Sequence, residues 1–298
     1  MTPNSQHDQA TTLRSTNDKI ELPGARSITR VHAITSGKGG VGKTALTVNT
    51  AVSLAKRGKS VLILDADLGL ANVDIALGLI PPYNLNHFFS GEQELNDIVV
   101  EGPHGIKVLP AGSGIQSFIR LNSELKMRLI DGLEQLNSHF DFVLIDTEAG
   151  ISDNVVYFNT AAQEILVVTT PEPTSITDAY ALMKLLSTRY HEKRFNLVIN
   201  QVESDEDALD VYRKLTMVAG RYLDISIDFL GSIPADKQMV QAIRKQQPLV
   251  EFDPESATSS AFADLAELLI NSHPSRDPKG SVQFFWQKLL NCGGDGSP

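Results

Sequence analysis

Short apolar runs recur along the chain, and longer segments with helical periodicity separate them. The runs are rich in Val, Ile and Leu and are apolar on both faces, which is typical of strands in a parallel sheet that helices cover on both sides. They span residues 31–35, 61–65, 106–110, 141–146, 165–170, 195–200 and 228–234. Helical patterns lie between most of them or follow the last, at residues 43–57, 122–137, 176–190, 205–220, 236–246 and 256–270. This alternation predicts an α/β fold, a single doubly wound and mostly parallel sheet of about seven or eight strands with helices on both faces.

The two ends of the chain depart from this pattern. Residues 1–28 have no sustained apolar period and predict a flexible leader before the sheet domain at 29–270. Residues 271–281 hold two prolines, a glycine and three serines, which predicts a linker. An amphipathic helical pattern follows at 282–291, and a polar, Gly-rich tail ends the chain at 292–298. The apolar face of the amphipathic pattern carries Val282, Phe285, Trp286, Leu289 and Leu290.

Composition limits the class of protein. At 298 residues, of which 42% are hydrophobic, the chain can bury a full core. No stretch approaches the roughly 18 apolar residues of a spanning helix, and the polar N-terminus lacks the apolar core of a secretory signal. The single cysteine, Cys292, excludes a disulfide framework, a Cys-x-x-Cys zinc site and an iron–sulfur cluster within one chain. The net charge of −10 argues against direct, non-specific DNA binding by the whole surface. We therefore expect a cytoplasmic globular protein.

A glycine-rich segment follows the first apolar run and opens the first helical pattern. Residues 37–44 (GKGGVGKT) fit the phosphate-loop pattern G-x-x-x-x-G-K-[ST] in the strand–helix context that it requires. Glycines let backbone N–H groups turn inward around an anion, and the positive end of the following helix adds to the attraction. Lys43 is expected to reach the β- and γ-phosphates, and the Thr44 hydroxyl to bind Mg²⁺. The predicted nucleotide site contains Gly37, Lys38, Gly39, Gly40, Val41, Gly42, Lys43, Thr44 and Ala45.

The loop holds a second lysine, Lys38. A phosphate loop does not need this lysine to bind the chain's own nucleotide. The segment KGGVGKT resembles the deviant phosphate loop of the MinD/ParA class of P-loop ATPases. The resemblance implies a MinD-like fold, ATP and Mg²⁺ as cofactors, and a Lys38 that reaches across a dimer interface to the partner's nucleotide. A second cation would also offset charge in the transition state. The resemblance thus implies a homodimer that forms with ATP and separates after slow hydrolysis.

Carboxylates stand at the ends of two apolar runs, at the edge where open α/β sheets bind ligands. Phosphoryl transfer needs a carboxylate near Mg²⁺ and a group that orients the attacking water. By resemblance, Asp67 positions the water, Asp146 is the acid near Mg²⁺, and Asp65 supports the switch segment. The expected catalytic residues are Lys38, Lys43, Asp67 and Asp146, and the expected metal ligands are Thr44, Asp65 and Asp146.

The same resemblance assigns further residues. It places Glu172 and Asp178 near the dimer interface. Glu148 departs from the family, which usually has Pro, Gly or Ala at that place. An extra carboxylate near the γ-phosphate repels it unless it is paired, so Glu148 slows hydrolysis, weakens dimerisation or pairs with a lysine, and the sequence does not choose among these. The residues implied around the adenine are Asn200, Pro234 and Asp236.

Residues 65–79 and 172–186 narrow the resemblance to the flagellar-number regulators known as FlhG, FleN or YlxH. Residues 8–14 (DQATTLR) match the activator motif in that family's leader, which implies docking on, and stimulation of, the GTPase FlhF. The family further implies control of flagellar number and placement by restraint of the flagellar master transcription activator, of FleQ or FlrA type. The implied contacts with FlhF are Asp8, Gln9, Ala10, Leu13 and Arg14.

The amphipathic segment occupies the place of the family's membrane-targeting helix, which implies peripheral contact with the inner membrane; a position at the cell pole is left open. A helix of this length with one positive charge binds a membrane weakly, and two copies in an ATP-bound dimer bind more tightly through avidity. The alternative is a terminal helix whose apolar face docks on the body of the protein.

Three other functions stay open. A DNA-partitioning ATPase of ParA type shares the loop, but the net charge argues against it. The division-site regulator MinD shares the loop and the terminal helix but does not need the motif at residues 8–14. A metal-cluster or reductase member of the superfamily has the least support, because the chain has no paired cysteines.

Overall fold

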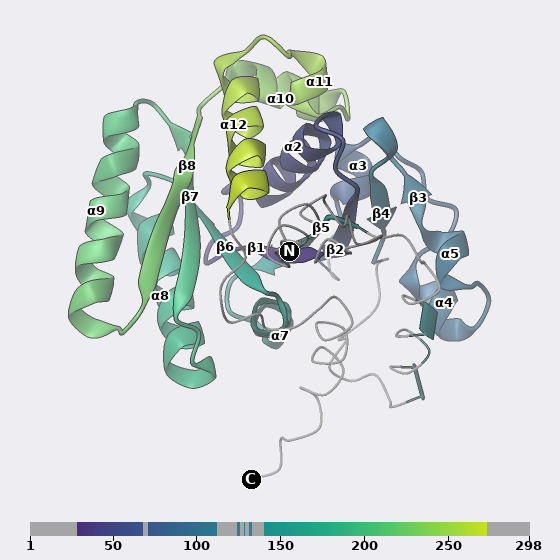
Figure 1. Ribbon diagram of the computed structural model, residues 1–298, viewed down its shortest axis with the longest axis horizontal. Coiled ribbons are helices and arrows are strands. Elements are labelled where there is room, and N and C mark those ends of the chain that lie inside the picture. The colour runs from purple at the N-terminus through teal and green to yellow at the C-terminus, as the bar shows by residue number, and fades with distance from the viewer. Residues whose placement is uncertain are drawn as a thin grey trace, which may run out of the picture.

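The computed structural model describes residues 29–67, 71–111, 124–125, 128, 131–132 and 140–272. In this part of the chain one eight-stranded sheet has the order β3-β4-β2-β5-β1-β6-β7-β8 (Figure 1). Its strands are β1 (Arg30–Ser36), β2 (Val61–Ala66), β3 (Val100–Glu101), β4 (Lys107–Leu109), β5 (Phe142–Ala149), β6 (Glu164–Thr169), β7 (Arg194–Val202) and β8 (Ser226–Pro234). All neighbouring pairs are parallel except β3 and β4, which are antiparallel.

Helices cover both faces of the sheet (Figure 1). In chain order they are α2 (Lys43–Lys56), α3 (Val73–Ala76), α4 (Leu85–Ser90), α5 (Leu95–Ile98), the 3₁₀ turn η1 (Pro103–Gly105), α7 (Asp153–Ala161), α8 (Pro173–Tyr190), α9 (Asp205–Tyr222), α10 (Lys237–Arg244), α11 (Leu249–Phe252) and α12 (Ala257–Asn271). α2, α10, α11 and α12 share one core with the sheet, whereas α4, α5, α7, α8 and α9 pack on the opposite face.

Strand β1 contributes side chains to the cores on both faces of the sheet. In β1, Ile34 faces the core under α2 and α12, and Val31 and Ala33 face the core above α7. Because both faces are covered, the strands are apolar at nearly every position rather than at alternate ones. Leu46 of α2 is completely buried, and truncating such a side chain typically costs about 2–5 kcal/mol. This packing fixes the helix that begins at the glycine-rich loop.

The predicted α/β fold is confirmed, and each predicted apolar run overlaps a strand. The sequence does not predict β3, because two residues are too few to show a pattern. It also does not predict α7, whose residues from Val155 to Ala161 are all buried, so the helix has no polar face and no helical period. The helical pattern at 122–137 lies largely outside the described residues.

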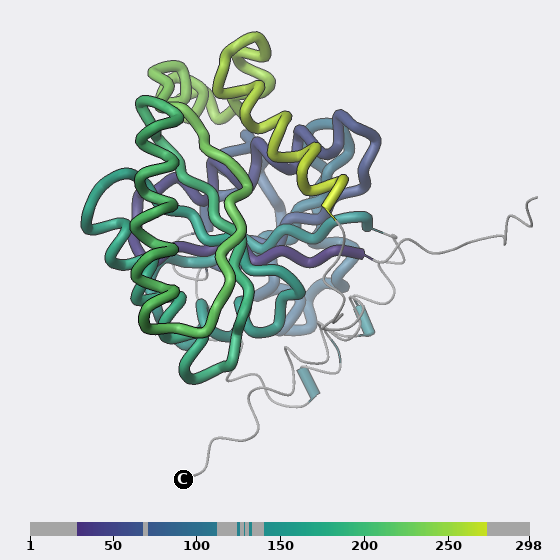
Figure 2. Tube along the Cα trace, turned by 60° about the vertical axis from the view of Figure 1, so that its left-hand side comes forward, coloured from purple at the N-terminus to yellow at the C-terminus, as the bar shows by residue number. Residues whose placement is uncertain are grey.

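The two ends of the described chain lie side by side, as Figure 2 shows for the end of α12 and the start of β1. The guanidinium group of Arg30 donates to the carbonyl oxygens of Leu269 and Ser272 and, at 2.7 Å, to the Ser272 hydroxyl. Glu164 accepts from the same guanidinium group at 3.0 Å. Arg30 therefore satisfies carbonyl groups that end α12. The predicted leader, most of the linker, the amphipathic segment and the tail lie outside the described residues.

Candidate functional site

The loop between β1 and α2 has the backbone that a phosphate loop requires. Gly40 and Gly42 have φ angles of 81° and 91°, a left-handed conformation that L side chains rarely adopt. A Cβ atom on Gly37 would overlap the backbone carbonyl of Asp178 in α8, and one on Gly42 would overlap the side chain of Asn200 in β7. No side chain caps the N-terminus of α2 within the described residues. The first N–H groups of α2 therefore fit an anionic ligand, which the helix dipole also attracts.

Lys43 supplies a buried cation at this loop. Its ammonium group donates to the Ser36 hydroxyl at 3.0 Å. Burial lowers the pKa of Lys43, and the carboxylates of Asp146, Asp67 and Glu148 act in the opposite direction. One buried amine thus faces several carboxylates at the position where the motif places the phosphates. Sequence interpretation missed Ser36, although its position directly before the loop is the signal that identifies it.

Asp146 and Thr44 form the oxygen pair that fits Mg²⁺. The Thr44 hydroxyl donates to Oδ2 of Asp146 at 2.6 Å, and the Thr47 hydroxyl donates to Oδ1 at 3.2 Å. Burial raises the pKa of Asp146 to about 6, against these two bonds and the charge of Lys43. Mg²⁺ prefers a few protein oxygens together with phosphate oxygens and water. Thr47 is a second missed residue, and its place three residues after Thr44 on one helix face is the signal for it.

Asp65 anchors the segment that leaves β2. It lies opposite Asp146 in the pairing of β2 with β5. Its oxygens accept backbone N–H groups from Asp67 at 3.1 Å, Asn72 at 2.9 Å and Val73 at 3.1 Å. Burial, and then the charge of Asp146, raise the pKa of Asp65 to about 7 in spite of these bonds. This geometry suits support of the switch segment, whereas metal ligation by Asp65 and water positioning by Asp67 stay predictions.

Lys38 points away from its own phosphate loop. Its ammonium group contacts Oε1 of Glu172 at 2.6 Å and the Thr174 hydroxyl at 2.7 Å, at the N-terminus of α8. The Thr174 hydroxyl also donates to Glu172 at 2.8 Å. The hydrogen bonds from Lys38 and Thr174, with the charge of Lys38, lower the pKa of Glu172. The loop thus keeps one amine inside and one at the surface, where the Lys38 side chain is 33% exposed.

Glu148 accepts a hydrogen bond from the Ser152 hydroxyl, which itself accepts from the N–H of Val155 and caps α7. The hydrogen-bond partner of Glu148 in the structure is therefore a hydroxyl group rather than a lysine. Its charge still acts on Lys43. Slower hydrolysis and weaker dimerisation stay open as consequences of this residue.

The residues expected around the adenine lie at the ends of β7 and β8. Nδ2 of Asn200 donates to the carbonyl oxygen of Val41 at 2.7 Å, so Asn200 fastens β7 to the loop. Asp236 accepts from the N–H of Gln238 at 2.7 Å and caps α10. Pro234 ends β8. The structure brings Asn200 to the phosphate loop, and the adenine contacts of all three residues stay predictions.

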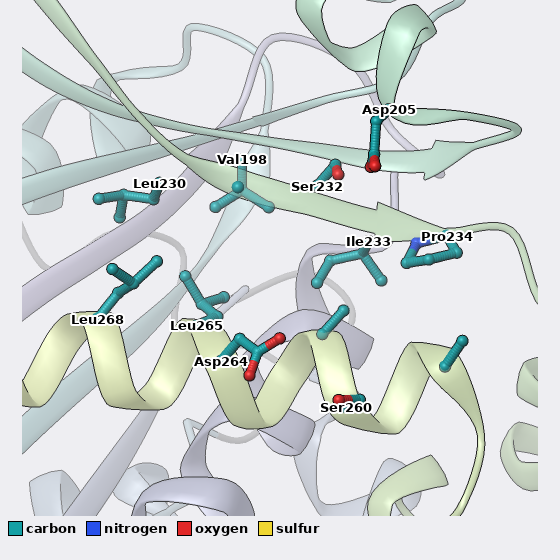
Figure 3. A pocket seen from close by; sticks show the side chains of 13 residues that line it. Val198, Asp205, Leu230, Ser232, Ile233, Pro234, Ser260, Asp264, Leu265 and Leu268 are labelled. Carbon is teal, nitrogen blue, oxygen red and sulfur yellow. The ribbon is translucent and has the colours of Figure 1, made fainter.

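A cavity of about 440 Å³ lies between β8 and α12 (Figure 3). In Figure 3 the side chains of Leu230 and Ile233 from β8 face those of Leu265 and Leu268 from α12. Pro234 lines this cavity, but no residue of the phosphate loop does. The cavity is therefore distinct from the phosphate site.

The FlhF contacts expected in residues 8–14 and the membrane contacts expected in 282–290 lie outside the described residues. Within the part of the chain that the structure describes, no helix has the length and apolar character needed to cross a bilayer.

Comparison with known proteins places this geometry in a family. The ParA family model, described as "NUBPL iron-transfer P-loop NTPase", matches residues 27–270. The antiactivator FleN of Pseudomonas aeruginosa is 42% identical over 268 residues, which cover 90% of this chain and 96% of FleN. The flagellum site-determining protein YlxH of Helicobacter pylori is 32% identical over 266 residues, covering 88% and 90%. The septum site-determining protein MinD of Pyrococcus horikoshii, solved with Mg-ADP, gives a TM-score of 0.64 at 27% identity and covers 82% of this chain and 97% of that one.

These matches confirm the resemblance seen in residues 37–44, and the Mg-ADP complex of a protein with the same fold agrees with a site for a nucleotide and Mg²⁺. The chain belongs to the ParA family of P-loop NTPases and is homologous to the flagellar regulators FleN and YlxH.

Proposed function

We propose that this chain is an ATP-dependent dimerisation switch with slow ATPase activity that regulates flagellar number and placement. The observation that carries the proposal is the opposite placement of two lysines in one loop. Lys43 is buried against Ser36, near Asp146, whereas Lys38 lies at the surface on Glu172. This difference supports a role for Lys43 at the chain's own nucleotide and a role for Lys38 toward a second copy.

The residues of the site divide the work of phosphoryl transfer. The N–H groups of the loop and Lys43 bind the phosphates, and Thr44 and Asp146 would hold Mg²⁺, which supplies charge neutralisation when bound. Asp67 orients the attacking water. Lys38 leaves Glu172 when two copies meet and contacts the phosphates of the partner's nucleotide.

Homology to FleN supports the cellular part of the proposal, because FleN is an antiactivator. We assign to this chain restraint of the flagellar master transcription activator, of FleQ or FlrA type. Residues 8–14 stimulate the GTPase FlhF, and the segment at 282–290 holds the dimer at the cytoplasmic face of the inner membrane. Weak binding of each segment suits a switch, since two segments in one dimer bind through avidity.

Light scattering with size-exclusion chromatography tests the switch. The wild-type chain is expected to be a dimer with ATP and Mg²⁺ and a monomer with ADP. Lys38→Ala should still bind ATP but stay monomeric, because the buried Lys43 is unchanged. Lys214→Ala is the matched control, since it removes an exposed lysine on α9 that pairs with Asp210. If the wild-type chain and the Asp67→Ala variant both bind ATP and both stay monomeric, the switch is disproved.

The contact between Lys38 and Glu172 allows a second test. Glu172→Gln removes the carboxylate that holds Lys38 within its own chain. The variant should therefore dimerise at a lower ATP concentration than the wild type. An unchanged or higher concentration would show that this contact does not compete with dimerisation.

The leader separates this proposal from a division-site regulator. Deletion of residues 1–20 should abolish stimulation of FlhF GTP turnover and leave ATP-dependent dimerisation intact. A chain that never stimulates FlhF, with or without its leader, would instead favour a MinD-type function.

A further inference from the structure

Helix α10 presents a basic and apolar face to the surroundings of the protein. Ala242 is its buried residue, and Met239 packs partly against the core. Opposite these two, at helical spacing, Lys237, Val240 and Arg244 form one line on the outward face. All three of these outward side chains are exposed.

Two apolar residues of α10 lie one turn apart at the surface. Val240 is 53% exposed and Ile243 is 54% exposed. An isolated exposed apolar residue is ordinary in soluble proteins. A pair of them between basic residues, on a helix with a buried opposite face, is instead the arrangement of helices that lie at a membrane surface.

The segment that begins with α10 is positively charged although the whole chain is strongly acidic. Residues 237–250 contain three basic residues and no acidic one, in a chain with a net charge of −10. None of the three takes part in an ion pair within the residues that the structure describes. The carboxylates that flank this segment are already engaged, since Asp236 caps α10 and Glu251 binds Lys56 and His104.

This combination complements an anionic lipid bilayer better than other acidic surfaces. Basic side chains near a membrane are attracted by anionic headgroups, while short apolar side chains enter the boundary between headgroups and acyl chains. Nucleic acid would use the positive charges but has no apolar layer for Val240 and Ile243.

The C-terminal segment can reach the same surface. α10 and α11 lie at one end of α12, and the described chain ends at the other end, after Ser272 (Figure 1). α12 has 15 residues, a length of about 22 Å. The nine residues between Ser272 and Val282 span at most about 34 Å. The segment at 282–290 can therefore lie level with α10.

We propose that α10 is a second membrane contact, specific for anionic phospholipid headgroups, that acts together with residues 282–290. This inference rests on the membrane attachment in the proposed function. The segment at 282–290 has aromatic residues but one basic residue, Lys288, whereas α10 has basic residues and few apolar ones. Stable peripheral attachment generally needs two such signals.

The test measures binding of the full-length chain, with ATP and Mg²⁺, to vesicles of phosphatidylglycerol and phosphatidylcholine and to vesicles of phosphatidylcholine alone. The double variant Lys237→Gln/Arg244→Gln should bind the anionic vesicles roughly thirty-fold more weakly, because each basic residue near the surface contributes about fivefold. The matched control is Arg213→Gln/Lys214→Gln, which makes the same change in charge on α9 and should bind as the wild type does. Val240→Asn should weaken binding to anionic vesicles without changing its salt dependence.

The outcomes separate this inference from the proposed function. If deletion of 282–298 abolishes vesicle binding and the α10 double variant binds as the wild type does, α10 is no membrane contact and the proposed attachment stands. If the deletion leaves binding to anionic vesicles that the α10 variant removes, the α10 contact stands and the proposed role of the C-terminal segment fails.

Loss of ATP-dependent dimerisation in the α10 variant would assign the surface to a second copy. Loss of DNA binding alone would assign it to nucleic acid. Either result overturns the lipid contact.

Discussion

Protonation of His32 is expected to destabilise the folded chain in acid. His32 lies in the middle of the sheet, on β1, and is completely buried. Neither ring nitrogen has a hydrogen-bond partner within the described residues. The ring stacks on Phe142 with a centroid distance of 5.9 Å, and Nδ1 lies 3.6 Å from Glu164. The surroundings of His32 therefore favour the neutral ring over the protonated one.

The pKa of His32 gives the size of the effect. Burial lowers this pKa from 6.5 to about 4, with Glu164 opposing and Arg30 adding to the shift. Because the folded chain binds the proton less tightly than the unfolded chain, the neutral ring contributes its full stability above about pH 6.5 and loses it as the pH falls toward 4. The shift corresponds to about 3 kcal/mol of the free energy of unfolding. About 2 kcal/mol of this contribution is lost by about pH 5.

Urea unfolding of the wild type and of His32→Leu, at about pH 7.5 and about pH 5, measures this quantity. The advantage of the wild type over the variant should shrink by about 2 kcal/mol at the lower pH. Asp65 and Asp146 titrate in the opposite sense, since their raised pKa values favour the folded state as the pH falls. Their contributions are common to both proteins and cancel in the difference. A constant difference for His32→Leu would refute the buried neutral ring.

Three substitutions test the nucleotide site itself. Lys43→Ala should abolish binding of a fluorescent ATP analogue, because it removes the buried amine at the phosphates; tight binding would contradict the loop assignment. Asp67→Ala should bind ATP, release phosphate slowly in a turnover assay and accumulate dimers, and a normal turnover rate would remove Asp67 from catalysis. Gly37→Ala places a Cβ against the backbone of Asp178 and should lower the free energy of unfolding by about 1–3 kcal/mol, measured by urea unfolding; an unchanged value would mean that α8 moves freely.

Strand positions could be predicted from the sequence because central strands such as β2 and β6 are nearly continuous apolar runs between polar segments. The same signal fails for α7, since Val155 to Ala161 are buried on every side and the helix shows no period. It fails for β3 because a strand of two residues has no pattern. Periodicity thus identifies helices that have one polar face and strands of typical length. It misses a helix that is buried on all sides and a strand of two residues.

For the site, likewise, the sequence predicts the contiguous motif but not the contacts between distant residues. The loop at 37–44 could be found because its residues are contiguous and each has a chemical reason to be there. The contact of Lys38 with Glu172 joins residues 134 positions apart, so no local pattern indicates it. The resemblance assigns Asn200 to the adenine, whereas the hydrogen bond from Asn200 to Val41 depends on how β7 lies beside the loop. Long-range partners of this kind follow from packing, which a pattern in one segment does not contain.

The environments of Lys38 and Lys43 support the proposal that this loop separates nucleotide binding from the assembly of two copies. Gly40 and Gly42, which lie between the two lysines, have left-handed backbone conformations. Lys43 is buried, whereas Lys38 is partly exposed. Burial lowers the pKa of Lys43, and the neighbouring carboxylates counteract this and favour its charged form. Lys38 is partly exposed and its ion pair with Glu172 is of the kind that exchanges partners readily. Loss of Lys43 should therefore remove nucleotide binding altogether, whereas loss of Lys38 should remove only the response that depends on a second copy.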